Sequence, residues 1–166
     1  MAASQFRTTQ AAIPSFDLDL GPLPNLVGYV LRRAQINVFK DFIDTCAEVG
    51  VRPVIYSILT IINLNPGARQ GVIGAALGIK RPNTVSLINE LESLGLAKRK
   101  PHQTDLRSHT IWLTPKGKNL LSHLDRLVQI HEQRMTDLLG EDDRKTLIDL
   151  LGRLQQVYGP DKDTGD

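Results

Sequence analysis

The sequence predicts a mainly α-helical fold that contains one small β-hairpin. Apolar residues recur at helical spacing through most of residues 23–157. Glycine and proline stand between these segments, at the places where helices end and begin. Residues 96–100 and 110–113 instead have the pattern of short strands, and a polar, charged stretch separates them.

The composition favours one compact unit over residues 21–166, because 166 residues with 41% hydrophobic content suffice for one substantial core. Residues 1–20 mix Ser, Thr, Gln and Asp with little periodicity, so we expect a flexible extension there. No basic start precedes an apolar signal segment, and no apolar run is long enough to span a bilayer. We therefore expect a cytoplasmic protein, and its single cysteine, Cys46, fits a reducing compartment.

The first two predicted helices are strongly apolar. The first covers residues 23–50, and its later half has a second apolar side at Ile36, Phe39, Ile43 and Cys46. A helix with one side in water does not need this second side, so we expect burial on both sides. Pro53 suits the first position of a second helix over residues 53–63, which we expect to lie in the core.

Two short helices around a glycine turn follow. The third is predicted over residues 69–77 and the fourth over residues 82–94, with Gly78 in the turn between them. Gly95 supplies the stop of the fourth helix. This arrangement is typical of a helix-turn-helix.

A hairpin and two long helices complete the chain. The strands at residues 96–100 and 110–113 form the hairpin, or wing. Thr114 and Pro115 cap a fifth helix that continues to residue 140, and the acidic residues 141–143 open a sixth.

The basic charge of the chain is local, and it coincides with these motifs. The net charge is +1 over residues 1–79, +5 over residues 80–118 and −4 over residues 119–166. A basic excess on a helix-turn-helix and its wing indicates binding to double-stranded DNA. A solvated basic surface is the alternative.

The fourth helix has the pattern of a recognition helix. A helical wheel places Thr84, Leu87, Ile88, Leu91 and Leu94 on one face, which we expect to be buried. The opposite face has the short side chains that enter a major groove, although polar outer faces are also common on solvated helices. Asn89 fits an adenine edge, Val85 a thymine methyl group and Ser86 several bases or a phosphate.

The wing concentrates cations and histidines, which are Lys98, Arg99, Lys100, His102, Arg107 and His109. Arg107 at the tip is suited to a narrow, electronegative minor groove. Asp105 has two interpretations: its carboxylate holds the guanidinium of Arg107, or it closes the turn through backbone amides. The candidate DNA-binding residues are Lys80, Arg81, Pro82, Asn83, Val85, Ser86, Asn89, Arg99, Asp105 and Arg107.

Four short motifs in register resemble the MarR family: residues 77–79 (Leu-Gly-Ile), 91–96 (Leu-Glu-Ser-Leu-Gly-Leu), 105–108 (Asp-Leu-Arg-Ser) and 113–117 (Leu-Thr-Pro-Lys-Gly). The resemblance implies a dimeric winged helix-turn-helix transcription regulator. Residues of about 52–114 would form the DNA-binding lobe, and residues of about 22–50 and 115–158 the dimerisation helices. It also implies that Arg107 enters the minor groove and that Pro82 through Asn89 enter the major groove.

Two departures from the family pattern concern the DNA sequence that is recognised. Val85-Ser86 stand where many members have Thr-Arg, and Arg69 stands where the third helix usually begins with Ser or Thr. The operator sequence of a relative therefore does not transfer to this chain.

Residues 28–35 (Gly-Tyr-Val-Leu-Arg-Arg-Ala-Gln) resemble a subgroup linked to aromatic-acid catabolism, in which acyl-CoA thioesters also serve as effectors. The resemblance implies a repressor that a small anionic aromatic acid or its acyl-CoA thioester releases from DNA. Cationic and aromatic side chains suited to such an effector are Tyr29, Arg32, Arg33, Phe39 and Tyr56, and each is equally compatible with a surface or core position.

Two alternatives compete with this function, namely redox sensing through Cys46 and non-specific architectural DNA binding. Enzymatic activity has little support, because no phosphate-binding glycine loop or nucleophile elbow is present and the histidines lack metal-site spacing. We expect no catalytic residue, metal site or cofactor.

Overall fold

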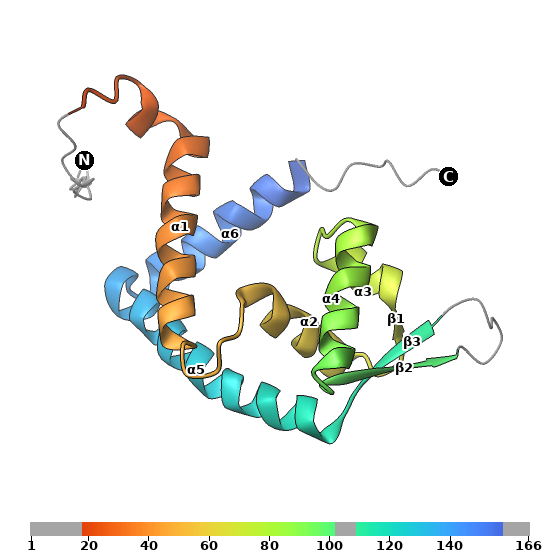
Figure 1. Ribbon diagram of the computed structural model, residues 1–166. Helices are drawn as coiled ribbons and strands as arrows, with labels where there is room; N and C mark the ends of the chain where they lie inside the picture. The colour runs from red at the N-terminus through yellow and green to blue at the C-terminus, as the bar shows by residue number, and fades with distance from the viewer. Residues whose placement is uncertain (1–17, 102–108, 158–166) are drawn as a thin grey trace. The chain divides into compact units, whose positions relative to one another are not determined.

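Residues 18–101 and 109–157 are described by the structure, a computed structural model of the chain (Figure 1). Their contacts divide the chain after Asn37 into two units, and each unit is described by itself. The elements in order are η1 (Leu23–Asn25), α1 (Val27–Thr45), α2 (Pro53–Leu64), β1 (Ala68–Arg69), α3 (Gln70–Ala76), α4 (Arg81–Ser93), β2 (Ala97–Pro101), β3 (His109–Leu113), α5 (Pro115–Leu139) and α6 (Glu141–Val157). The predicted class, mainly helical with a small hairpin, is confirmed.

The helix boundaries follow local chemistry. Pro53 begins α2, where its missing N–H would have had no helical partner. The Thr114 hydroxyl accepts a hydrogen bond from the backbone N–H of Gly117 at 3.1 Å and so caps α5. Gly95 follows α4 with φ at +69°, a conformation that costs glycine little and ends the helix.

Boundary predictions for three helices were wrong. The first helix begins at Val27, after the 3-10 turn Leu23–Asn25, and ends at Thr45. Turns cover residues 46–50, so Gly50 ends this turn region and not the helix itself. Arg69 lies in a short strand and caps α3, which begins at Gln70. Leu94 is the C-cap of α4 and is 49% exposed, since the helix ends before this residue completes the buried face.

The first helix is also less buried within one chain than the sequence indicates. Phe42 is its buried residue, and Cys46 just beyond its end is fully buried. Phe39 and Ile43 are 46% and 50% exposed, so the core takes only one side of this part of the helix. The predicted burial on both sides is wrong for the single chain.

The sheet contains a strand that the sequence did not predict. Its order is β1-β3-β2, and both pairings are antiparallel. In β1, Ala68 pairs with Ile111 and Arg69 with Thr110, while the hairpin pairs residues 97–101 with residues 113–109. A strand of two residues is too short to show alternation, which is why β1 has no sequence signal.

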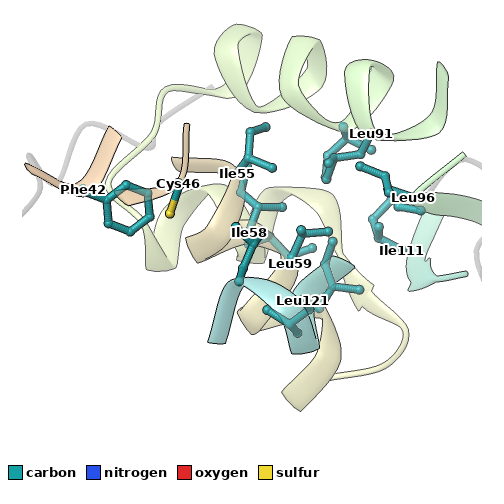
Figure 2. Close-up of a cluster of buried hydrophobic side chains, with 14 residues drawn as sticks. Phe42, Cys46, Ile55, Ile58, Leu59, Leu91, Leu96, Ile111 and Leu121 are labelled. Carbon is teal, nitrogen blue, oxygen red and sulfur yellow. The ribbon is translucent and has the colours of Figure 1, made fainter. Parts of the chain in front are cut away.

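The hydrophobic core is centred on α2. Ile58, Leu59 and Ile62 of this helix are almost completely buried. They lie in a cluster with Leu91 of α4, Ile111 of β3 and Leu121 of α5 (Figure 2). The core therefore joins α4, β3 and α5 in one packed structure.

Several short-range contacts tie the end of α4 to the start of α5. The Thr114 hydroxyl donates to the carbonyl oxygen of Gly95 at 2.7 Å, and the Lys116 ammonium donates to that of Leu94 at 2.9 Å. Gly117 is buried, and a Cβ there would overlap the carbonyl oxygen of Leu96. The α4–α5 junction, defined by these contacts, leaves no space for a side chain at residue 117.

We expect Gly117→Ala to lower the free energy of unfolding by about 1 to 3 kcal/mol, because the backbone of Leu96 must move to admit the methyl group. The measurement is urea unfolding at a fixed protein concentration. Gly71→Ala is the matched control: residue 71 is exposed in α3 and has open space around it, so a change below about 1 kcal/mol is expected. Equal denaturation midpoints for Gly117→Ala and wild type would contradict the tight junction.

Candidate DNA interface and effector region

The buried face of α4 determines which of its side chains are exposed to solvent. Ile88 and Leu91 have no exposed area, and Thr84 is 1% exposed. The Thr84 hydroxyl lies 3.3 Å from the carbonyl oxygens of both Ile79 and Lys80, to which it donates. A Cβ at Gly74 of α3 would overlap this hydroxyl, so the two helices of the motif pack in close contact.

The candidate major-groove residues lie on the opposite, exposed face. All of these residues are exposed: Lys80, Arg81, Pro82, Asn83, Val85 and Ser86 lie just before α4 or in its N-terminal half, and Asn89 lies in its C-terminal half. Val85 is 37% exposed, which leaves an apolar surface available for contact. The arrangement fits the N-terminal presentation that major-groove recognition requires.

The wing has a defined stem. Lys98 and Lys100 are exposed on β2, and the Lys100 ammonium lies 4.4 Å from the centroid of the Trp112 ring. Pro101 pairs with His109 in the last pair of the ladder. Asp105 and Arg107 lie outside the described residues, so their predicted roles remain predictions.

Arg99 differs from its two lysine neighbours, because its side chain is engaged within the lobe. Its guanidinium forms an ion pair with Glu92 of α4 and donates to the Gln70 side-chain oxygen at 2.9 Å. Arg99 is among the residues predicted to contact DNA, and the sequence contains no signal for these two partners, which lie 7 and 29 residues away.

The candidate effector residues fall in both units. Tyr29, Arg32 and Arg33 belong to the unit that ends at Asn37, where Arg32 is exposed and the other two are partly buried. Phe39 and Tyr56 belong to the second unit. The role of these five residues in binding an effector therefore remains a prediction.

Tyr56 is held in place by two contacts in the second unit. Its hydroxyl donates to the Asp125 carboxylate at 3.1 Å, and its ring centroid lies 6.2 Å from that of Phe42. Burial raises the pKa of Tyr56, and the neighbouring Asp125 carboxylate raises it further. Tyr56 therefore remains a neutral hydrogen-bond donor that links α2 to α5.

A second link joins α1 to α5 through a buried histidine. His131 is 4% exposed, and its Nδ1 lies 2.6 Å from the Asp41 carboxylate, to which it donates. Arg134 donates to the same carboxylate at 2.9 Å and to the Thr45 hydroxyl at 2.7 Å. The hydrogen bond from His131, aided by Arg134, holds the pKa of Asp41 below its ordinary value although partial burial opposes this shift.

A cleft of about 330 Å³ lies beside the C-terminal half of α4. Arg52 and Glu90 form an ion pair of 2.5 Å at this cleft, and Lys116 also lines it. The remaining lining is mainly apolar and consists of Val49, Gly50, Val51, Ile55, Leu94, Leu96 and Leu120. A cleft of this size with a mainly apolar wall suits a small acyl or aryl group, although Arg52 is paired with Glu90 and Lys116 donates to the Leu94 carbonyl oxygen.

This cleft was not predicted from the sequence, because its walls come from the segment before α2, from α2 itself, from the end of α4, from the residues between α4 and β2 and from α5. No single segment shows a pattern for it. Among the described residues, no group of three or more His, Cys, Asp and Glu side chains is arranged to hold a metal ion. None of the described helices combines the length and apolar composition that a membrane crossing requires.

Cys46, the residue of the redox alternative, is fully buried. Burial raises the pKa of its thiol, and the nearby Glu48 carboxylate raises it further. Both effects disfavour the thiolate that reacts with oxidants.

We expect Cys46 to react with iodoacetamide far more slowly in the native protein than in urea, because the thiol must become exposed before it is alkylated. We also expect DNA affinity to be unchanged after peroxide treatment, with a Cys46→Ala variant as the control. A loss of DNA binding that occurs in wild type and is absent from the variant would restore the redox alternative.

Comparison with known proteins extends these observations to nearly the whole chain. Residues 49–108 match the MarR family. The putative transcriptional regulatory protein for the hcr operon of Thauera aromatica is 34% identical over 145 residues, which is 87% of this chain and 86% of that protein.

The structure is also similar to those of the transcriptional repressor CouR. With CouR bound to a 23-mer DNA duplex the sequence identity is 41% and the TM-score 0.80, over 84% of this chain and 99% of that one. With CouR bound to p-coumaroyl-CoA the identity is 40% and the TM-score 0.78, over 83% of this chain and 97% of that one.

Proposed function

The chain belongs to the MarR family, and we propose that it is a repressor that binds operator DNA as a homodimer and releases it on binding an aromatic acyl-CoA thioester or the corresponding acid. One observation carries this proposal: 41% identity and a shared fold over 99% of a repressor that has been solved on DNA. The relatives are regulators of transcription, so this chain is a regulator rather than an enzyme. We also propose a cytoplasmic location, because a regulator of transcription must reach DNA.

Two parts of the lobe are proposed to contact DNA. The exposed face of α4 enters the major groove, where Val85 near its N-terminus contacts a thymine methyl group and Asn89, in its second half, an adenine edge. Lys80 and Arg81, just before and at the first residue of α4, contact phosphates. Arg107 of the wing enters the minor groove.

The homodimer proposal is supported by exposed apolar side chains on the terminal helices. In the first unit they are Val27, Val30 and Leu31 of α1. In the second unit α6 exposes Leu147, Ile148, Leu150 and Leu154, which are 37% to 55% exposed. Apolar faces of this kind are typical of surfaces that a second copy covers.

We expect Arg107→Ala to weaken binding to the DNA upstream of the protein's own gene by about 1 to 3 kcal/mol, because one inserted contact is lost. Fluorescence anisotropy at fixed salt measures this change. Lys145→Ala, an exposed cation on α6, is the control and should leave the affinity unchanged. Equal affinity of Arg107→Ala and wild type would remove the wing from the proposed interface.

The same titration separates a repressor from an architectural DNA-binding protein. At matched salt, the affinity of a repressor for its upstream DNA should exceed its affinity for random DNA of equal length by a factor of about 10³ or more. An architectural protein should bind both duplexes equally.

Two observations support the proposed effector: the ligand of a relative and the cationic side chains of this chain. CouR is solved with p-coumaroyl-CoA, an aromatic acyl group joined to an anionic carrier. Arg32 and Arg33 of the first unit, with Tyr29, are one candidate binding region, and Phe39 and Tyr56 of the second unit are further candidates. The cleft with Arg52 and Lys116 is another, and an occupant there would contact α4 directly.

We expect p-coumaroyl-CoA to release the protein from its upstream DNA, while CoA alone does not, because the aromatic acyl group supplies the apolar contact. Arg32→Ala and Arg52→Ala distinguish the two regions: the variant that needs more effector for half-release identifies the region that binds it. The DNA affinity of each variant without effector is the control. Failure of p-coumaroyl-CoA, p-coumarate and related aromatic acids to release DNA would overturn the effector proposal and leave the DNA-binding proposal intact.

A further inference from the structure

Arg99 lies at a junction of three elements, namely β2, α4 and α3. Its backbone N–H donates to one carboxylate oxygen of Glu92 at 2.8 Å, and its guanidinium pairs with the other. The guanidinium also donates to the side-chain oxygen of Gln70 at 2.9 Å. Glu92 lies in the last turn of α4, Gln70 is the first residue of α3, and Arg99 itself is in β2.

The surroundings of Arg99 are those of a structural contact. Its side chain is 21% exposed and that of Glu92 is 30% exposed, so solvent screens this pair less than a surface pair. Lys98 and Lys100 on the other face of the strand are exposed to solvent. Among the described cations of β2, Arg99 is thus the one whose charge is balanced by a carboxylate of the same lobe, that of Glu92.

We propose that Arg99 is a positioning residue for DNA recognition and not a phosphate contact. This inference rests on the proposed DNA-binding function. The Glu92–Arg99–Gln70 junction fixes the base of the wing against the C-terminal end of α4 and the start of α3. Strand β2 ends at Pro101, two residues after Arg99, so the junction sets how the wing strands and the exposed face of α4 reach their two grooves together.

Glu92→Ala separates the two roles by the sign of its effect. If Arg99 contacts a phosphate, removing Glu92 releases its guanidinium and removes a negative charge, so binding to DNA strengthens. If Arg99 positions the wing, the same substitution breaks the junction and binding to the operator weakens. Glu90→Ala is the charge-matched control, because it removes a carboxylate from the same helix and leaves the junction in place.

The experiment measures affinities for the upstream DNA and for random DNA over a series of salt concentrations. Each affinity is normalised to the fraction of protein that is competent to bind. We expect Arg99→Ala and Glu92→Ala each to weaken operator binding about tenfold, as for loss of one charge-assisted hydrogen bond. Binding to random DNA and the salt dependence should stay as in wild type, since the number of phosphate contacts is unchanged.

Two further variants test the junction as a unit. The double variant Arg99→Ala with Glu92→Ala should bind the operator no more weakly than either single variant. Glu92→Gln keeps the length and the acceptor of the side chain, so it should restore most of the affinity that Glu92→Ala loses. Parallel losses on operator and random DNA would indicate general destabilisation and would overturn the positioning role.

A different result for the two substitutions also overturns the proposal. If Arg99→Ala lowers the slope of log affinity against log salt concentration by about one, and Glu92→Ala binds DNA more tightly, Arg99 contacts a phosphate. Failure of the proposed function has a different signature. In that case wild type itself shows no preference for its upstream DNA over random DNA.

Discussion

The burial of α2 is the constraint on which the rest of the structure depends. Its three almost completely buried residues, Ile58, Leu59 and Ile62, fill the space between α5, the wing strand β3 and the helix-turn-helix. Helix α2 contacts α3 and β3, and these elements with β2 hold α4, so α4 is tied to α2 mainly through its neighbours. Thr84, Ile88 and Leu91 then turn the polar side of α4 outward, so the candidate DNA contacts are positioned by a core that contains none of them.

Features that depend on local chemistry could be predicted from the sequence. Thr114 and Pro115 mark the start of α5 because capping involves only neighbouring residues, and Gly95 marks the end of α4 for the same reason. The outward side of α4 was predictable because helical spacing alone separates it from Ile88 and Leu91. The family motifs led to the same fold by resemblance.

Features that join distant segments could not be predicted in this way. The ion pair of Arg99 with Glu92, the His131–Asp41 hydrogen bond and the cleft at Arg52 depend on contacts between separate elements. Arg99 and its neighbours look alike in the sequence, and only the strand's orientation separates a matched guanidinium from two exposed ammonium groups. A basic segment therefore indicates that DNA is bound, but it does not indicate which of its cations touch the DNA.

The α4–α5 junction has a consequence for the geometry of the proposed homodimer. Thr114 donates to the carbonyl oxygen of Gly95 and Lys116 to that of Leu94, both just after the last residue of α4, and no side chain fits at Gly117. In a symmetric dimer the two recognition helices must match half-sites that repeat with the DNA turn, about 34 Å apart. Because the end of α4 is held against the start of α5, a small rotation of α5 would change the distance between the two α4 helices of the proposed dimer. The two α4 helices would then no longer match the two half-sites on the DNA, although both DNA-binding lobes remain folded.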